Sequence, residues 1–116
     1  MKISGYTLHG NYYLADKIVS WKNWERSIRM KEVIILPNGK KVIAHTLSKE
    51  KLETIPKKER KCDKWYWTST PNDDSNAWYV NYRGDFIYIN IEYSFDYGGA
   101  HLGFHKNEIK QLLDIE

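Results

Sequence analysis

Few side chains in this sequence of 116 residues could carry out covalent chemistry. Cys62 is the only cysteine, and Lys61 and Lys64 beside it are the kind of neighbours that lower the pKa of a thiol and make it nucleophilic. A single cysteine is nevertheless more commonly a fortuitous residue than a catalytic one, so the sequence favours no nucleophilic enzyme. One cysteine also excludes an internal disulfide, and the fold must therefore depend on its hydrophobic core.

Metal-ligating side chains are also sparse. His101 and His105 are four residues apart with Asp96 upstream, but on an extended strand such histidines lie about 13 Å apart and do not share an ion. The acidic loop 72–76 offers oxygen ligands for calcium, and its alternative is a plain solvated turn. Neither paired carboxylates at catalytic spacing nor a phosphate-binding glycine loop is present. We therefore expect no metal site, no cofactor and no enzymatic activity.

The length and composition predict one folded domain over residues 1–116. With 41% hydrophobic and 15% aromatic residues, the chain is too apolar to be disordered. No apolar run approaches the roughly 20 residues that a helix needs to span a bilayer. The N-terminus also lacks the apolar core of a signal peptide. We therefore expect a cytoplasmic protein with no membrane partner.

Short apolar runs separated by turn residues predict an α+β class with mostly antiparallel sheet in the second half of the chain. Asn38-Gly39 predicts a hairpin over residues 33–43 with a two-residue turn. Gly84 separates two further strands, and Gly98-Gly99 precede the last one. The other expected strands span residues 2–8, 11–15, 64–70, 77–83, 85–93 and 100–105.

Three short helices are expected. The first is capped by Ser20, because three apolar residues follow at helical spacing: Trp21, Trp24 and Ile28. The second spans residues 49–55, with Ser48 before it and Pro56 ending it. The third is capped by Asn107 and carries an apolar stripe made of Ile109, Leu112, Leu113 and Ile115.

The predicted strand over residues 85–93 alternates between two sets of side chains. The isoleucines are expected to face the core: Ile87, Ile89 and Ile91. The intervening side chains are expected to face solvent: Tyr88, Asn90 and Glu92. The strand would then present one row of polar and aromatic side chains on the surface.

The stretch from Trp65 to Pro71, WYWTSTP, is followed by NAWYVN over residues 76–81, then by Gly84 and Gly98-Gly99. This order resembles small bacterial and phage domains of the C-type lectin superfamily, whose members read WW-x-R-S-P, then A-Y-V-N, then G, then G-V-R-P. That superfamily also includes ligand-binding domains diversified by retroelements and, more distantly, the formylglycine-generating enzymes. The resemblance covers residues 33–105.

The resemblance implies a C-type-lectin-like fold, with a central twisted antiparallel sheet and two or three short helices. It implies that Trp78, Val80 and either Trp65 or Trp67 lie in the core, and that residues 68–71 form a structural turn. The formylglycine-generating relatives need a cysteine pair, which this chain lacks. The family's terminal arginine is also missing here, and His101 lies near its place.

The sequence therefore predicts a non-catalytic module that binds another macromolecule, most naturally a protein. The region that corresponds to the variable surface of diversified relatives supplies the expected contact residues: Tyr82, Tyr88, Asn90, Glu92, Tyr93, Phe95 and Tyr97. Tyrosine-rich surfaces bind proteins well, because tyrosine gives large contact area at low entropic cost. Such a protein from a phage or mobile element could block a host factor, and a homodimer could bury the same surface.

Nucleic-acid binding is the alternative prediction. Residues 57–61 are expected to form an exposed connection, and with Lys64 they supply five cations: Lys57, Lys58, Arg60, Lys61 and Lys64. Trp65 and Tyr66 follow directly, and aromatics next to cations can stack on bases while the cations contact phosphates. The second half of the chain is acidic, which argues against a broad basic face.

Overall fold

The structure, a computed structural model, describes residues 3–20, 22–93 and 98–109. The expected α+β class is confirmed, but the strands form two five-stranded sheets in place of one central sheet. Sheet A contains, in spatial order, β1 (Tyr6–His9), β2 (Tyr12–Ala15), β10 (Leu102–His105), β5 (Lys41–Thr46) and β4 (Lys31–Ile35). Sheet B contains, in spatial order, β3 (Val19–Ser20), β9 (Gly98–Ala100), β6 (Trp65–Pro71), β7 (Asn76–Val80) and β8 (Phe86–Asn90).

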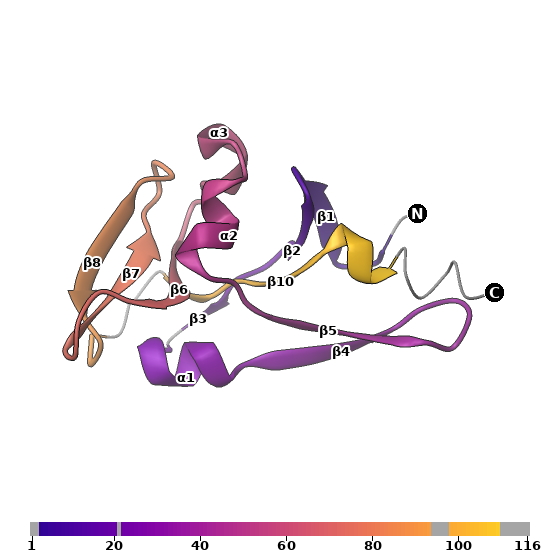
Figure 1. The fold of residues 1–116 in the computed structure, drawn as a ribbon, viewed down its shortest axis with the longest axis horizontal. Helices are drawn as coiled ribbons and strands as arrows, with labels where there is room; N and C mark the ends of the chain where they lie inside the picture. The colour runs from indigo at the N-terminus through magenta and orange to yellow at the C-terminus, as the bar shows by residue number, and fades with distance from the viewer. Residues whose placement is uncertain (1–2, 21, 94–97, 110–116) are drawn as a thin grey trace.

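The two sheets are joined through β9 and β10, which are separated in sequence by His101 alone. Sheet A is antiparallel throughout. In sheet B, β6 and β9 are parallel, whereas the other pairings are antiparallel. The molecule measures 45 × 26 × 23 Å, and Figure 1 shows β8 and the β4–β5 hairpin at opposite ends of its long axis.

Two of the three expected helices begin where local capping chemistry dictates. Helix α1 (Trp24–Arg29) is capped by Asn23, whose side chain accepts a hydrogen bond from the Arg26 N–H. The prediction of a Ser20 cap is wrong, because Ser20 pairs with Gly99 in sheet B. Helix α2 (Lys49–Glu53) begins after Ser48 as expected, and the Ser48 hydroxyl accepts from the Lys51 N–H, but the helix ends two residues before the predicted end at residue 55.

The expected connection after Pro56 contains a further helical turn, α3 (Lys57–Arg60), for which Pro56 is the cap residue. Proline is tolerated at a helix start, because the first N–H groups of a helix have no partner within it. The last helix spans 106–109, so the predicted Asn107 cap is wrong: Asn107 lies inside the helix and donates its N–H to Nδ1 of His105. Ile109 is buried as expected, whereas Leu112, Leu113 and Ile115 lie outside the described residues.

The β4–β5 and β7–β8 hairpins each use a three-residue loop that ends in glycine. The two-residue turn predicted at Asn38-Gly39 is wrong: the Leu36 N–H donates to the Lys40 carbonyl, which leaves Pro37, Asn38 and Gly39 in the loop. Gly39 supplies a positive φ, of 84°. Gly84 has the same place in the β7–β8 hairpin, with φ of 85°, and its predicted position between two strands is confirmed.

The core contains three clusters, and the aromatics identified in the sequence belong to two of them. Trp67, Ala77 and Tyr79 form one cluster, against which Trp24 of α1 packs. Tyr66 and Val80 point to the other face of sheet B, where they meet Leu52 and Ile55 beneath α2 and α3. The third cluster lies on sheet A and includes Tyr6, Val42, Leu102, Phe104 and Ile109.

The expected core positions are confirmed for Trp67 and Val80, while Trp65 and Trp78 are half-buried. Residues 68–71, expected to form a turn, instead continue strand β6 across an irregularity in its register with β7. Thr68 explains the irregularity in part, because its buried hydroxyl donates to the Trp78 carbonyl at 2.9 Å.

The two hairpin glycines provide a matched test of packing. Both have a positive φ, so alanine at either position should cost about 1 to 2 kcal/mol of unfolding free energy. A Cβ at Gly84 would also lie 2.6 Å from the Lys57 carbonyl oxygen, whereas one at Gly39 would meet no atom within 4 Å. Urea unfolding should show Gly84→Ala destabilised by a further ~1–3 kcal/mol relative to Gly39→Ala. Equal losses would mean that α3 does not hold the β7–β8 turn.

Candidate binding surface

Strand β8 forms one edge of sheet B, and none of the described strands pairs with its outer side. Its sequence, Phe86-Ile87-Tyr88-Ile89-Asn90, contains no charged residue and no proline. Edge strands that must stay unpaired usually carry charges, proline or a bulge, because their free N–H and C=O groups otherwise invite another strand. Strand β8 has none of these features, and β7–β8 pairing is regular throughout.

Large side chains are exposed along this edge. Tyr82 is 53% exposed in the turn before β8, Tyr88 is 53% exposed within it, and Tyr93 is 45% exposed after it. Asn90 and Glu92 are also exposed, as the alternation predicted. Two further predicted contact residues, Phe95 and Tyr97, lie outside the described residues.

Strand β8 presents side chains on both of its faces. Tyr88 is opposite Trp78, on the face that α2 covers, whereas Ile87 is opposite Tyr79 on the other face. On that other face, burial is the main cause that raises the pKa of Tyr79, and Tyr93 adds to the shift.

One of the isoleucine predictions is wrong. Ile87 is 40% exposed, because no strand or helix described here packs beyond the edge strand that carries it. Ile89 and Ile91 are half-buried and pack against the cluster around Trp67, which agrees with their expected inward orientation. The exposed surface therefore includes an aliphatic side chain that the alternation had placed in the core.

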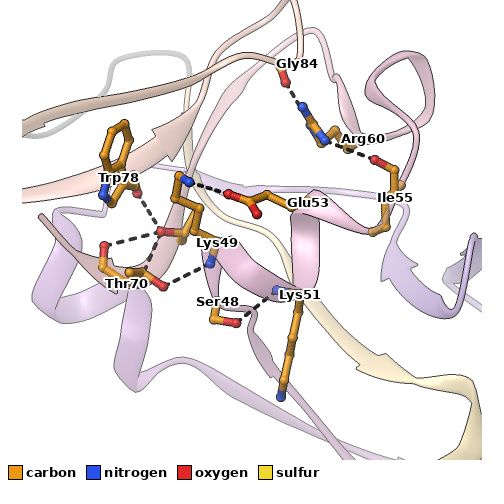
Figure 2. Close-up of polar contacts among 10 residues, drawn as sticks. Ser48, Lys49, Lys51, Glu53, Ile55, Arg60, Thr70, Trp78 and Gly84 are labelled. Atoms are coloured by element: carbon orange, nitrogen blue, oxygen red, sulfur yellow. Dashed lines mark hydrogen bonds and ion pairs between the residues drawn. The ribbon is translucent and has the colours of Figure 1, made fainter.

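Helix α2 supports the Tyr88 face through Lys49 (Figure 2). The Lys49 N–H donates to the Thr70 hydroxyl at 3.0 Å, which ties the start of α2 to the end of β6. Its ammonium group pairs with Glu53 and lies 5.0 Å from the Trp78 ring centre and 5.2 Å from that of Phe86. Trp78 in turn meets Tyr88 edge-on, with ring centres 5.2 Å apart. The Trp78 ring thus contacts Lys49 and Tyr88 at once.

Helix α3 supports the start of β8 through Arg60 (Figure 2). Its guanidinium donates to the Gly84 carbonyl at 2.8 Å and to the Ile55 carbonyl at 3.1 Å. The same group lies 4.5 Å from the Phe86 ring centre. A planar guanidinium carries several N–H donors in fixed directions. Arg60 therefore links the β7–β8 turn to the segment after α2 by hydrogen bonds to both.

The alternative nucleic-acid residues are mostly engaged inside the molecule. Lys57 pairs with Asp85, and this hydrogen bond is the main reason why the pKa of Asp85 is lowered. Lys64 donates to the Ser20 hydroxyl at 3.2 Å, and Arg60 makes the contacts just described. Tyr66, a proposed stacking residue, is fully buried. The remaining two cations, Lys58 and Lys61, are exposed.

Cys62 has a partner that the sequence did not indicate. Its Sγ lies 3.9 Å from Nδ1 of His101, the residue between β9 and β10. The imidazole is buried, stands edge-on to Tyr66 at 4.6 Å, and has Nε2 2.7 Å from the Ala15 carbonyl oxygen. With Asp16, Lys17, Ile18, Asp63 and Lys64, the pair lines a cavity of about 320 Å³.

Burial determines the charge state of this pair. Burial, reinforced by the charge of Asp63, raises the pKa of Cys62 to about 11, so the predicted lowering by Lys61 and Lys64 is wrong. Burial also lowers the pKa of His101 to about 4. Near neutral pH both side chains are therefore uncharged, whereas a cysteine nucleophile acts as the thiolate. A hydrogen-bonded structural role fits this pair.

The acidic loop behaves as a solvated turn. The Asp73 carboxylate accepts hydrogen bonds from the Ser75 and Asn76 N–H groups and from the Asn76 side chain, which together lower its pKa. No cluster of three histidine, cysteine or acidic residues that could hold a metal occurs within residues 3–20, 22–93 and 98–109. No helix among these residues is long and apolar enough to cross a bilayer.

Comparisons of the chain with family models, curated proteins and solved structures give no match.

The buried His101 predicts an acid-sensitive fold. Its pKa is about 4 when folded and about 6.5 when exposed, so the unfolded chain binds the extra proton first as pH falls. The stability that the neutral imidazole provides is fully present above pH 6.5 and is lost as pH falls towards 4. The expected loss of unfolding free energy is on the order of 3 kcal/mol.

Urea unfolding between pH 7 and 4, with the His101→Gln variant as control, measures this loss. The glutamine can still donate to the Ala15 carbonyl but does not titrate, so its unfolding free energy should fall less over the same range. Titration of the His101 ring protons by NMR gives the pKa directly. A midpoint near 6.5 would contradict the burial argument.

Proposed function

We propose that this protein is a non-catalytic binding module that recognises another protein through β8 and the tyrosines that flank it. The observation that carries the proposal is an uncharged edge strand with three half-exposed tyrosines: Tyr82, Tyr88 and Tyr93. Exposed apolar groups of this kind on a small domain are typical of an interaction site. The uncharged Cys62–His101 pair supports a role without catalysis.

A partner segment that adds to the edge of sheet B would explain both the uncharged edge strand and the exposed tyrosines beside it. Main-chain hydrogen bonds to β8 would provide affinity, and contacts on either side of the strand would provide specificity. Tyrosines supply large contact area with few torsions to restrict. The contacts of Lys49 and Arg60 with Trp78 and Phe86 hold the strand before binding, which reduces the entropy lost when the partner arrives.

We also propose that the chain has a C-type-lectin-like architecture, in which sheet B corresponds to the central sheet of that superfamily. Support comes from the order of the sequence motifs that now lie on β6 and β7. The single, half-buried thiol suits a reducing compartment such as the cytoplasm. In a phage or mobile element, the bound protein would be a host factor whose own contacts the module blocks.

A pull-down from nuclease-treated lysate of the source cells tests the proposed function. The Tyr88→Ala/Tyr93→Ala variant removes two exposed rings and should lose the bound protein, with at least a tenfold drop in captured material, since exposed tyrosines are frequent binding hot spots. The matched control is Val33→Ala/Ile35→Ala, which removes two exposed side chains from β4 at the opposite end of the molecule. This control should capture the protein as the unmodified chain does.

The outcomes separate the two predicted partner classes. A protein retained by the tyrosine variant and lost by the β4 control would move the site to sheet A. A signal that appears only when nuclease is omitted would support the nucleic-acid alternative, and Lys58→Glu/Lys61→Glu should then abolish it. Circular dichroism of each variant checks that it remains folded.

A further inference from the structure

We infer that β8 pairs antiparallel with β8 of a second copy, about a twofold axis at Tyr88. The two B sheets would then form one continuous sheet, with five strands from each copy. This inference rests on the proposed function, because it uses the same edge of sheet B and names a second copy of the chain as the protein that occupies it. It depends on four observations about β8: its register, its uncharged sequence, the charges at its two ends, and its contrast with β4.

The register of β8 is compatible with self-pairing. A twofold axis perpendicular to a sheet keeps each face on the same side, so paired residues must point to the same face. An axis at Tyr88 meets this condition, since it pairs Tyr88 with Tyr88, Ile87 with Ile89, and Phe86 with Asn90. None of these pairs contains a charged side chain, and like charges across strands are the usual obstacle to such pairing.

Self-pairing would also extend rows of side chains that exist within one copy. Trp78 already lies opposite Tyr88 on β7, so the dimer would hold a row of four aromatic rings, Trp78 and Tyr88 from each copy. On the other face, Tyr79 lies opposite Ile87 and Ala77 opposite Ile89. The exposed Ile87 would gain Ile89 of the second copy as an apolar neighbour, which removes the exposed surface that the monomer leaves on this face.

The charges at the two ends of β8 are complementary. Arg83 is exposed in the turn before the strand, and Glu92 is exposed in the turn after it. Antiparallel pairing brings the first turn of one copy to the second turn of the other. Arg83 of one copy would then lie near Glu92 of the second, and the twofold axis repeats the contact at the other end.

The other sheet ends in β4, which is a poorer candidate for the same pairing. Its sequence, Lys31-Glu32-Val33-Ile34-Ile35, would place Lys31 opposite Ile35 and Glu32 opposite Ile34 if it paired about Val33. Each of these contacts would set a charge against an apolar side chain without an ionic partner. Lysine on an edge is also a common protection against added strands. Strand β4 therefore serves as the matched control.

Sedimentation velocity of the purified chain at tens of micromolar tests the inference. The unmodified protein should be a dimer, and Ile87→Lys should be a monomer, because it sets an ammonium group against Ile89 of the second copy. Val33→Lys makes the same change at an exposed position of β4 and should stay dimeric. A monomeric unmodified protein, or loss of the dimer in both variants, would overturn the inference.

Disulfide trapping tests the register itself. In a Cys62→Ser background, Tyr88→Cys puts two thiols directly opposite each other across the proposed axis, and oxidised glutathione should convert most of the chain to a covalent dimer. Tyr82→Cys is the control, because the two copies of this residue would lie at opposite ends of the paired strands. Trapping of the control at a similar yield, or none at Tyr88→Cys, would contradict the register.

Failure of the inference is distinguishable from failure of the proposed function. The sedimentation and trapping measurements use the purified chain alone, whereas the pull-down reports on other proteins. A monomer that still captures a protein through Tyr88 would overturn the dimer and leave the proposed function intact. A trapped dimer that captures nothing would confirm self-pairing and contradict recognition of a different protein.

Discussion

The crossing of the chain from sheet B to sheet A at residues 98–105 is the constraint on which the rest of this structure depends. Strands β9 and β10 each lie inside their sheet, so two sheets are anchored on one short segment. Main chains approach closely there: a Cβ at Gly99 would lie 1.9 Å from the Val19 carbonyl oxygen, and one at Gly103 would lie 2.7 Å from that of Tyr13. Glycine is required at both positions because larger residues would separate the neighbouring strands.

His101 lies between β9 and β10 at this crossing, and its environment explains why it is structural. Its hydrogen bond with the Ala15 carbonyl joins the crossing to the end of β2, and its edge-on contact with Tyr66 joins it to β6. A buried imidazole with these partners is stable when neutral, and the adjacent Cys62 is a thiol for the same reason. The residues with the greatest catalytic potential in the sequence therefore stabilise the connection between the sheets.

From the crossing, sheet B extends through β6 and β7 to the edge strand β8. The aromatic side chains along this path become progressively more exposed. Trp67 and Tyr66 are buried on opposite faces of β6, while Trp78 is half-buried on β7 and Tyr88 is exposed on β8. The aromatic richness of residues 65–88 thus has two causes in one sheet. The inner rings form the core of a small domain, and the outer rings continue the same packing to a surface that lacks a neighbour.

Local sequence signals determined much of the secondary structure. The Ser48 cap, the hairpin positions of Gly39 and Gly84, and the outward orientation of Tyr88 depend on neighbours close in sequence, so they were predictable. Even so, the predicted two-residue length of the loop at Asn38-Gly39 was wrong, because the pairing of Leu36 with Lys40 sets the loop length.

The order of strands, by contrast, depends on residues far apart in sequence, and only the tertiary structure decided it. Tertiary structure divided the strands between two sheets and made β8 an edge, so that Ile87 became a surface residue although its alternation indicated the core. It also buried Cys62 against His101, and this burial raises the pKa of the thiol although two lysines are close to it in sequence. Composition and local pattern thus predicted most secondary-structure elements and the exposed tyrosines. Burial and long-range pairing decided which side chains are charged and which are exposed.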